Sequence, residues 1–446
     1  MGNLGLKRRV RKCSFDGDDY VHIDLPNVEE VLSLNVCVQK KDPWHPDILH
    51  SSWEMLTKEN FLRLFDKDGR IVDEHQLRRA IFRGGVDPSI RKEVWRFLYG
   101  LFPFHSTERE RETLLVDYYL RYRARKYCCH KIISKVHGED MIILNNADVN
   151  DDNLNEELSR ITSNKNFVEN NKQKLECLKL LAKLEAEKQM VDLDNLIKDI
   201  KIIKTDIVRT DRDHPYFSGD DNPHLDIARN ILILFSAFHP HIGYTQGMND
   251  ILSRFLVVLD SEFEAYWCFV KYIENTQQDY HPDGMVKKLD TFCNLLEKID
   301  PELYFFLIEA QIATQLFTRW FLVTFKRELE YNDALRLFEI LSSRYLEMNS
   351  LETQRVKQFG EIAIKQAGRR IYYGEPINNS DLTFDLFVCL ALLVVKRRCI
   401  LLSKDGMVLG DLLCNIGKGV DLKTILNVAS HLLFDYCRKS GMESFL

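Results

Sequence analysis

Two polar segments stand among the apolar stretches of the sequence, and the first covers residues 203–212. It carries Ile203, Asp206 and Arg209, with the aspartate three residues before the arginine. Side chains three residues apart on a helix can touch, so Asp206 is placed to hold the stem of Arg209 and leave its guanidinium free. A free guanidinium spans two oxygens of a phosphate or carboxylate. The alternative interpretation is an ordinary surface ion pair, which contributes little to stability.

The second segment covers residues 243–250, where Gly243 and Gly247 bracket Tyr244 and Gln246. Glycines allow the backbone to come close to a large neighbour, and the Asn249-Asp250 pair that follows is suited to the start of a helix. The segment therefore presents an aromatic ring and an amide at a tight turn. Taken alone, it is equally an ordinary helix-capping turn.

Other polar patterns lack the residues that their chemistry requires. Residues 417–419 resemble part of a phosphate-binding loop, but the glycine five positions earlier and the Ser or Thr after Lys418 are missing. Residues 148–159 have the acidic spacing of a calcium loop without its central glycine or its final glutamate. His239 and His241 have no Cys or acidic partner at ligand spacing, so no metal site is predicted.

The residues around both segments predict helices, because apolar side chains recur at helical spacing. Residues 387–395 are apolar on every face and predict a buried helix. A weak alternation at residues 20–23 is the only strand signal that we assign. The amphipathic stripes are Leu225-Ala228-Leu232-Phe235-Phe238, Met248-Ile251-Leu252-Phe255-Leu259, Trp320-Leu322-Val323-Phe325 and Ala334-Leu337-Phe338-Leu341.

Three stretches depart from this helical pattern. Residues 1–75 have a mixed pattern and are interpreted as an N-terminal flank. Residues of about 138–172 are rich in Asn, Asp and Glu and predict a solvated loop, as do the polar residues of about 349–382. The first loop leads into a Lys/Glu-rich helix for which we expect one apolar face, made of Leu175, Leu178, Leu181 and Leu184.

Composition narrows the class of protein. Hydrophobic residues make up 45% of the 446 residues, which is enough for a sizeable core and excludes a wholly disordered chain. With 61 Lys+Arg against 67 Asp+Glu, the net charge of −6 excludes binding of nucleic acid by bulk charge. The 11 cysteines form no C-x-x-C pair, which indicates reduced thiols. No signal peptide or membrane-length apolar run is present, so we expect a cytoplasmic protein whose membrane contact is indirect or peripheral.

Together and in this order, the two polar segments resemble the TBC domain, a family of GTPase-activating proteins for Rab GTPases. Ile203, Asp206 and Arg209 match its I-x-x-D-x-x-R motif, and Tyr244 and Gln246 match its Y-x-Q motif. Further matches lie in residues 83–100, 262–269 and 319–329, so that the resemblance covers about 76–435. Residues 209–217 resemble the subgroup of members 15, 17 and 25, with member 25 the nearest.

This resemblance implies a function and a role for each motif residue. The chain would accelerate GTP hydrolysis by a Rab GTPase, with Arg209 as an arginine finger and Gln246 as a glutamine finger, and so regulate vesicle traffic. Asp206 would fix the arginine's helix and Tyr244 would pack the glutamine turn. The other motif residues would support these four; they are Ile203, Gly247, Asn249, Asp250, Arg91 and Trp95. Of these, we interpret Arg91 and Trp95 as stabilising the fold rather than contacting phosphate.

The resemblance also implies the architecture and the partners. We expect an all-α, two-lobed TBC domain over residues 76–435, after the flank 1–75 and before a short tail at 436–446. The protein would be an enzyme activator with no turnover of its own and no cofactor, since GTP and Mg²⁺ belong to the partner. Recruitment to endosomal or autophagic membranes would fit this role. The alternatives are a catalytically silent Rab-binding scaffold and a helical scaffold unrelated to GTPases.

Overall fold

The computed structural model describes residues 53–137, 154–162, 167–311, 315–346, 382–403 and 405–439. Within these ranges the protein is helical, and its β contacts are two isolated bridges, Leu56 with Val86 and Phe65 with Ile71. The all-α prediction is confirmed, whereas the strand expected at residues 20–23 lies outside the described part of the chain. Among the described helices, none has the length and apolar character needed to span a bilayer.

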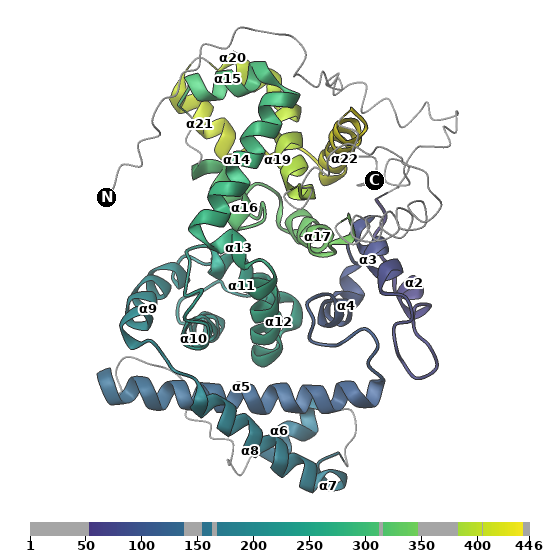
Figure 1. Ribbon diagram of the computed structural model, residues 1–446, viewed down its shortest axis with the longest axis vertical. Coiled ribbons are helices and arrows are strands. Elements are labelled where there is room, and N and C mark those ends of the chain that lie inside the picture. Colours follow the sequence, from purple (N-terminus) through teal and green to yellow (C-terminus); the bar gives the residue numbers. More distant parts are fainter. Residues whose placement is uncertain are drawn as a thin grey trace, which may run out of the picture.

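The first lobe is organised along a long helix, α5 (Glu108–His137), which runs across one end of the molecule (Figure 1). α8 (Lys172–Lys188) packs against α5 from outside, and α10 (Pro223–Phe238) and α12 (Glu262–Asn275) pack against it from the interior. The remaining helices of this lobe are α2 (Lys58–Leu62), α4 (Arg91–Leu98), α6 (Leu154–Ile161), α7 (Phe167–Asn170), α9 (Leu193–Ile207) and α11 (Met248–Leu259). Their apolar faces form one core.

The second lobe occupies the opposite end of the molecule and has a core of its own (Figure 1). Its centre is α19 (Phe384–Val395), which is apolar on all sides, is almost wholly buried and packs on α22 (Leu422–Lys439). The prediction of a buried helix at residues 387–395 is therefore confirmed. The other helices here are α13 (Gln277–Tyr280), α14 (Pro282–Ile299), α15 (Pro301–Glu309), α16 (Gln315–Leu322), α20 (Arg397–Leu402) and α21 (Gly406–Cys414).

Two helices belong to both lobes. α17 (Tyr331–Ser342) places Phe338 in the first core and Leu337 in the second. α3 (Glu74–Phe82) does the same with Ile81 and Phe82. The predicted two-lobed arrangement is thus held together by shared helices, on which consecutive side chains enter different cores.

The predicted stripe of residues 320–325 does not form one continuous helix. α16 ends at Leu322, and Thr324 and Phe325 then take left-handed backbone conformations with φ of 50° and 54°. Phe325 is nevertheless fully buried. Phe325 is thus apolar because it is buried in a tight turn, and not because it belongs to a helical stripe.

The acidic and amide-rich stretch at 138–172 is not the continuous loop that its composition predicts. Residues 154–162 and 167–172 are described, and most of them lie in α6, α7 and the start of α8. Leu154 and Leu158, four residues apart, are buried in the first core. Two leucines at helical spacing outweigh a polar composition, because they provide one buried face. The second predicted loop, at 349–382, lies almost entirely outside the described residues.

α8 forms where a helix was expected, but its buried face differs from the predicted one. Leu175 is buried together with Ala182 and Ala186, whereas Leu181 and Leu184 are exposed. A spacing of three residues drifts by about 60° per step on a helix of 3.6 residues per turn, so the predicted leucine stripe winds out of the core.

The predicted domain limits both fall inside helices. The boundary after residue 75 cuts α3, and the boundary after residue 435 cuts α22. Before α3, Leu56, Phe61 and Ile71 are buried in the first core. The described part of the predicted flank is therefore integral to the helical body.

Candidate functional site

Helix α9 positions the first polar motif. Asp192 caps its start by accepting a hydrogen bond from the backbone N–H of Asn195. Its buried face runs through Leu196, Ile200 and Ile203 and reaches Asp206, whose side chain is only 3% exposed. Asp206 thus lies on the buried face of α9, in the last turn of the helix.

The Asp206 carboxylate is the centre of a buried network. Its Oδ1 accepts a hydrogen bond of 2.5 Å from Nη2 of Arg209, and its Oδ2 accepts one of 2.8 Å from the hydroxyl of Tyr244. Burial, followed by the neighbouring Asp206, raises the pKa of Tyr244, so the phenol keeps its proton and acts as the donor. One carboxylate therefore joins the two polar segments.

The geometry of Arg209 differs from the prediction in two ways. α9 ends at Ile207, so Arg209 lies in the turn beyond the helix instead of on it. Asp206 binds the guanidinium itself and does not merely hold the stem. The cause is the turn, which brings the end of the arginine side chain back over the helix terminus. The Arg209 side chain is still 50% exposed.

The second segment is a tight turn that leads into α11. Gly243 and Gly247 both adopt positive φ, 66° and 107°. A Cβ at Gly247 would lie 3.2 Å from Val323, so both conformation and space favour glycine there. The backbone N–H of Tyr244 donates to Asp199 on α9, while the Gln246 side chain is exposed.

Asn249 provides a second link between the segments. Its Oδ1 accepts from the backbone N–H of Gly247 at 3.2 Å, and its Nδ2 donates to Oγ1 of Thr210 at 3.0 Å. Thr210 follows Arg209 directly and also donates to the backbone carbonyl of Asp206. Two independent side-chain links thus fix the Gln246 turn relative to the Arg209 turn.

Asp250 also belongs to this region, and it binds cations from a distant part of the chain. Its carboxylate accepts from Nζ of Lys326 at 3.2 Å and from Nη2 of Arg327 at 2.7 Å. Burial alone would raise the pKa of Asp250, but Lys326 and Arg327 outweigh it and hold that pKa below its usual range. Lys326 also donates to Asp211, two residues after Arg209.

Arg91 and Trp95 lie in a different network. Nε of Arg91 and Nε1 of Trp95 both donate to Oε1 of Glu339, at 2.6 and 2.7 Å. The backbone N–H of Val86 donates to the other oxygen of the same carboxylate. All three side chains are buried, so Arg91 and Trp95 connect the start of the first lobe to α17 and are not exposed beside Arg209 and Gln246.

Sequence reasoning missed several residues of these networks, namely Asp199, Thr210, Asp211, Lys326, Arg327 and Glu339. Thr210 and Asp211 stand beside Arg209, and adjacency to the motif was the available signal. Lys326, Arg327 and Glu339 are separated from their partners by 76 residues or more, so spacing carries no signal for them. The match of residues 319–329 to the TBC family was the available signal for Lys326 and Arg327.

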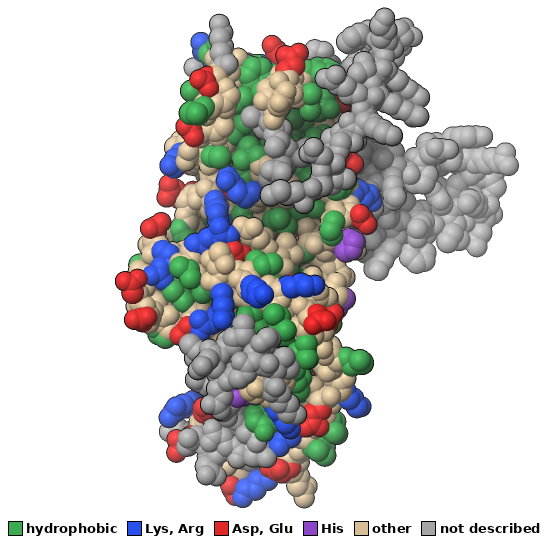
Figure 2. Space-filling view, turned by 90° about the vertical axis from the view of Figure 1, so that its left-hand side faces the viewer, with side chains coloured by type: hydrophobic (Ala, Val, Ile, Leu, Met, Phe, Trp, Pro, Cys, Tyr) green, Lys and Arg blue, Asp and Glu red, His purple; other side chains and the backbone are tan. Residues whose placement is uncertain are grey.

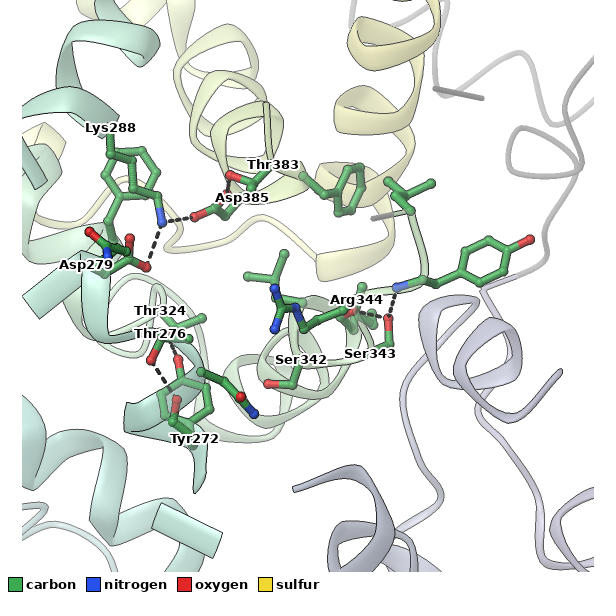
Figure 3. Close-up of a pocket in the computed structure, with 18 of the residues that line it drawn as sticks. Tyr272, Thr276, Asp279, Lys288, Thr324, Ser342, Ser343, Arg344, Thr383 and Asp385 are labelled. Carbon is green, nitrogen blue, oxygen red and sulfur yellow. Dashed lines mark hydrogen bonds and ion pairs between the residues drawn. The ribbon is translucent and has the colours of Figure 1, made fainter. Parts of the chain in front are cut away.

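The structure also contains a cavity of about 650 Å³ between the lobes, lined by residues of α12, α13, α14, α17 and the start of α19. Figure 3 shows Lys288 on one side of this cavity, between Asp279 and Asp385, which lie 2.9 and 2.7 Å from its Nζ. None of the ten predicted site residues lines this cavity. Arg209 and Gln246, the two residues predicted to act on a partner, are exposed away from it, and the residues that hold them are buried.

Comparisons with known proteins agree with the motifs. The sequence model of the Rab-GTPase-TBC domain matches residues 163–351. TBC1 domain family member 25 of Mus musculus is 30% identical over 320 residues, which cover 71% of this chain and 34% of that protein. The GTPase-activating protein GYP7 of Yarrowia lipolytica is 32% identical over 287 residues, covering 63% and 35% of the two chains.

The fold has a solved counterpart as well. The crystal structure of the Ypt/Rab-GAP domain of Gyp1p superposes with a TM-score of 0.55 at 17% identity, covering 86% of this chain and 98% of that one. The chain spans about a third of the length of the curated relatives named above. Its motifs, its two-lobed helical fold and these matches together place the chain in the TBC-domain family.

Proposed function

We propose that this chain is a GTPase-activating protein for a Rab-family small GTPase, to which it supplies Arg209 and Gln246 in trans. The observation that carries the proposal is the Asp206–Tyr244 hydrogen bond beneath an exposed guanidinium and an exposed carboxamide. Buried side chains hold the two segments together, while the groups that would act on a partner remain outside. The names of the relatives, which include GTPase-activating proteins, support the same activity.

The chemistry of GTP hydrolysis explains why these two groups are useful. A small GTPase is slow because charge that develops on the transferred phosphate is poorly stabilised and the attacking water is poorly held. An arginine supplied in trans accelerates hydrolysis by roughly 10³–10⁵-fold, which corresponds to about 4–7 kcal/mol. Gln246 would orient the water, and Arg209 would stabilise the phosphate oxygens.

Asp206 gives the guanidinium a defined direction. A guanidinium has five N–H donors, and the contact with Asp206 uses one of its nitrogens. An arginine held at one end loses less freedom when it enters the partner's nucleotide site. Lysine would keep the charge without the planar fork, so Arg209→Lys is expected to recover little activity. GTP and Mg²⁺ would come from the partner.

The test is a screen of phosphate release from a panel of GTP-loaded Rab GTPases. The wild-type chain should stimulate at least one member, which would then define the membrane traffic step that it regulates. Arg209→Ala and Gln246→Ala should each reduce the stimulated rate by about 100-fold or more while remaining folded. Arg63→Ala, at an arginine that is 68% exposed and pairs with Glu59, and Gln173→Ala, on the outer face of α8, are the matched controls.

The outcomes separate the proposal from its alternative. Full activity of Arg209→Ala would disprove the arginine assignment. Binding of a GTP-loaded Rab by the wild-type chain without faster hydrolysis would identify a silent scaffold. The results for the variants require that their circular dichroism and thermal unfolding match those of the wild type.

A further inference from the structure

The turn after α16 leads into two consecutive cations, Lys326 and Arg327. Thr324 and Phe325 both have positive φ, and the backbone carbonyls of Val323 and Thr324 accept from Nη2 of Arg254, at 2.7 and 3.2 Å. Arg254 is 1% exposed, and its guanidinium lies 4.5 Å from the centre of the Phe338 ring. A buried arginine thus stabilises a left-handed turn, and Lys326 and Arg327 follow directly.

These two cations have different surroundings. Lys326 is buried, with 5% of its side chain exposed, and donates to Asp211, Asp250 and Ser253. The Arg327 side chain is 49% exposed, and its only hydrogen bond among the described residues is the one to Asp250. Lys326 therefore supplies the buried charge that Asp250 needs, whereas Arg327 extends from the same carboxylate into solvent.

Arg327 repeats the arrangement found at Arg209. Each arginine is about half exposed, and each makes one guanidinium contact with an aspartate whose side chain is 3% or 4% exposed. Lys326 connects the two sites, because it contacts Asp250 and also Asp211, two residues after Arg209. Gln246 precedes Asp250 by four residues, so it lies on the segment that leads into the carboxylate to which Arg327 binds.

The pattern of burial gives this region a cationic outer layer. Asp206, Asp250 and Glu328 are 2–3% exposed, while their arginine partners, Arg209, Arg327 and Arg319, have side chains that are 35–50% exposed. The carboxylates lie inside and the guanidinium groups outside, although the pairs are neutral in sum. Figure 2 shows Lys and Arg side chains gathered across the middle of one face of the molecule, with few acidic side chains among them.

We propose that Arg327 is a binding residue for the GTPase, and that it pairs with a carboxylate on the GTPase surface beside the nucleotide site. This inference rests on the proposed function, in which Arg209 and Gln246 act on the nucleotide. Arg327 belongs to another segment of the chain, and Asp250, which binds it, lies about one helical turn after the Gln246 turn. We therefore expect Arg327 to contact the protein surface around the nucleotide and not the nucleotide itself. Arginine suits this role because its planar fork binds a carboxylate through two parallel hydrogen bonds.

The substitution Arg327→Ala tests the proposal without disrupting the core, because Asp250 keeps Lys326 as its counter-charge. With the Rab that responds best in the screen, KM and kcat are measured for the wild type, Arg327→Ala, Arg327→Lys and the control Arg63→Ala. We expect Arg327→Ala to raise KM by about 10-fold, the effect of one lost charge-assisted hydrogen bond pair, and to change kcat by less than about 3-fold. Arg327→Lys should recover part of the loss, and Arg63→Ala should behave as the wild type.

Binding to the Rab loaded with a non-hydrolysable GTP analogue gives an independent readout. The dissociation constant should rise with salt more steeply for the wild type than for Arg327→Ala, because one screened charge pair is missing from the variant. Scanning acidic surface residues of the Rab should identify one whose substitution by alanine has no further effect in the Arg327→Ala background.

Three results would overturn the inference. An unchanged KM and dissociation constant for Arg327→Ala, with an active wild type, would remove Arg327 from the interface and leave the proposed function intact. A loss confined to kcat and as large as that of Arg209→Ala would place Arg327 on the phosphates instead. A wild-type chain that neither binds nor stimulates any Rab would reject both the proposed function and this inference.

Discussion

The hydroxyl of Tyr244 lies 2.8 Å from Oδ2 of Asp206, and the other oxygen of that carboxylate binds Arg209. One buried carboxylate thereby connects Arg209 with Tyr244, which lies two residues before Gln246. The position of either exposed group depends on a residue that belongs to the other segment. A conservative change at this contact is therefore expected to affect both.

The Tyr244→Phe variant removes only the hydroxyl and leaves Oδ2 of the buried Asp206 without its donor. A buried acceptor left unsatisfied costs about 1–3 kcal/mol, so the free energy of unfolding should fall by that amount. The stimulated rate of GTP hydrolysis should fall by about 10-fold, because one of the two side-chain links that align the segments is lost. Urea unfolding and phosphate release measure the two effects. Tyr127→Phe, at a residue that is 36% exposed, is the control, and equal behaviour of both variants would argue against the coupling.

Substitution of Arg91 by alanine should damage the fold and spare the site. It leaves Glu339, which is fully buried, without a counter-charge, and breaking a buried ion pair from one side costs about 3–5 kcal/mol. The midpoint of urea unfolding should therefore fall strongly, while the stimulated rate per folded molecule stays close to wild type. Arg63→Ala should change stability by less than about 0.5 kcal/mol. A variant of normal stability that had lost activity would instead support a phosphate contact.

The packing of α6 can be tested at Leu158. This side chain is fully buried, so Leu158→Ala should lower the free energy of unfolding by about 2–5 kcal/mol. Leu180, on the outer face of α8, is 58% exposed, and Leu180→Ala should have little effect. Denaturant unfolding of the two variants makes the comparison. Equal, small effects would mean that residues 154–162 behave as the solvated loop that composition predicts.

Stability should depend on pH through His239. Burial is the main cause that lowers the pKa of His239 to about 4, and the nearby Arg125 acts in the same direction against Glu274 and the Phe235 carbonyl. The folded-state pKa lies below the unfolded value of about 6.5, so the unfolded chain binds the extra proton between these limits. This contribution to stability is complete above about pH 6.5 and is lost as the pH falls towards 4, by about 2–3 kcal/mol.

The His239→Gln variant isolates this effect. Glutamine does not titrate, so the variant should lose less stability than the wild type between pH 7 and pH 4.5 in parallel thermal unfolding experiments. Identical pH profiles for the two proteins would show that His239 titrates normally.

Much of the fold could be read from periodicity. The stripes that became α10, α11 and α17, and the uniformly apolar α19, were predicted correctly because each helix buries a face through its own side chains. Errors arose in two places. Phe325 is buried in a left-handed turn and not on a helix face, and the polar composition of residues 138–172 concealed Leu154 and Leu158, two leucines at helical spacing that are buried in the first core.

The sequence by itself determined which residues could act, since the spacing of Asp206 and Arg209 and of Tyr244 and Gln246 is local. Tertiary structure alone decided how they are held. In the structure, Arg209 lies beyond the end of α9, and the hydroxyl of Tyr244 donates to Asp206. Lys326 and Arg327 bind Asp250, although more than 70 residues separate them from it in the sequence. The physical reason is that a buried carboxylate must accept hydrogen bonds from some donors. Packing, and not distance along the sequence, decides which donors lie close enough.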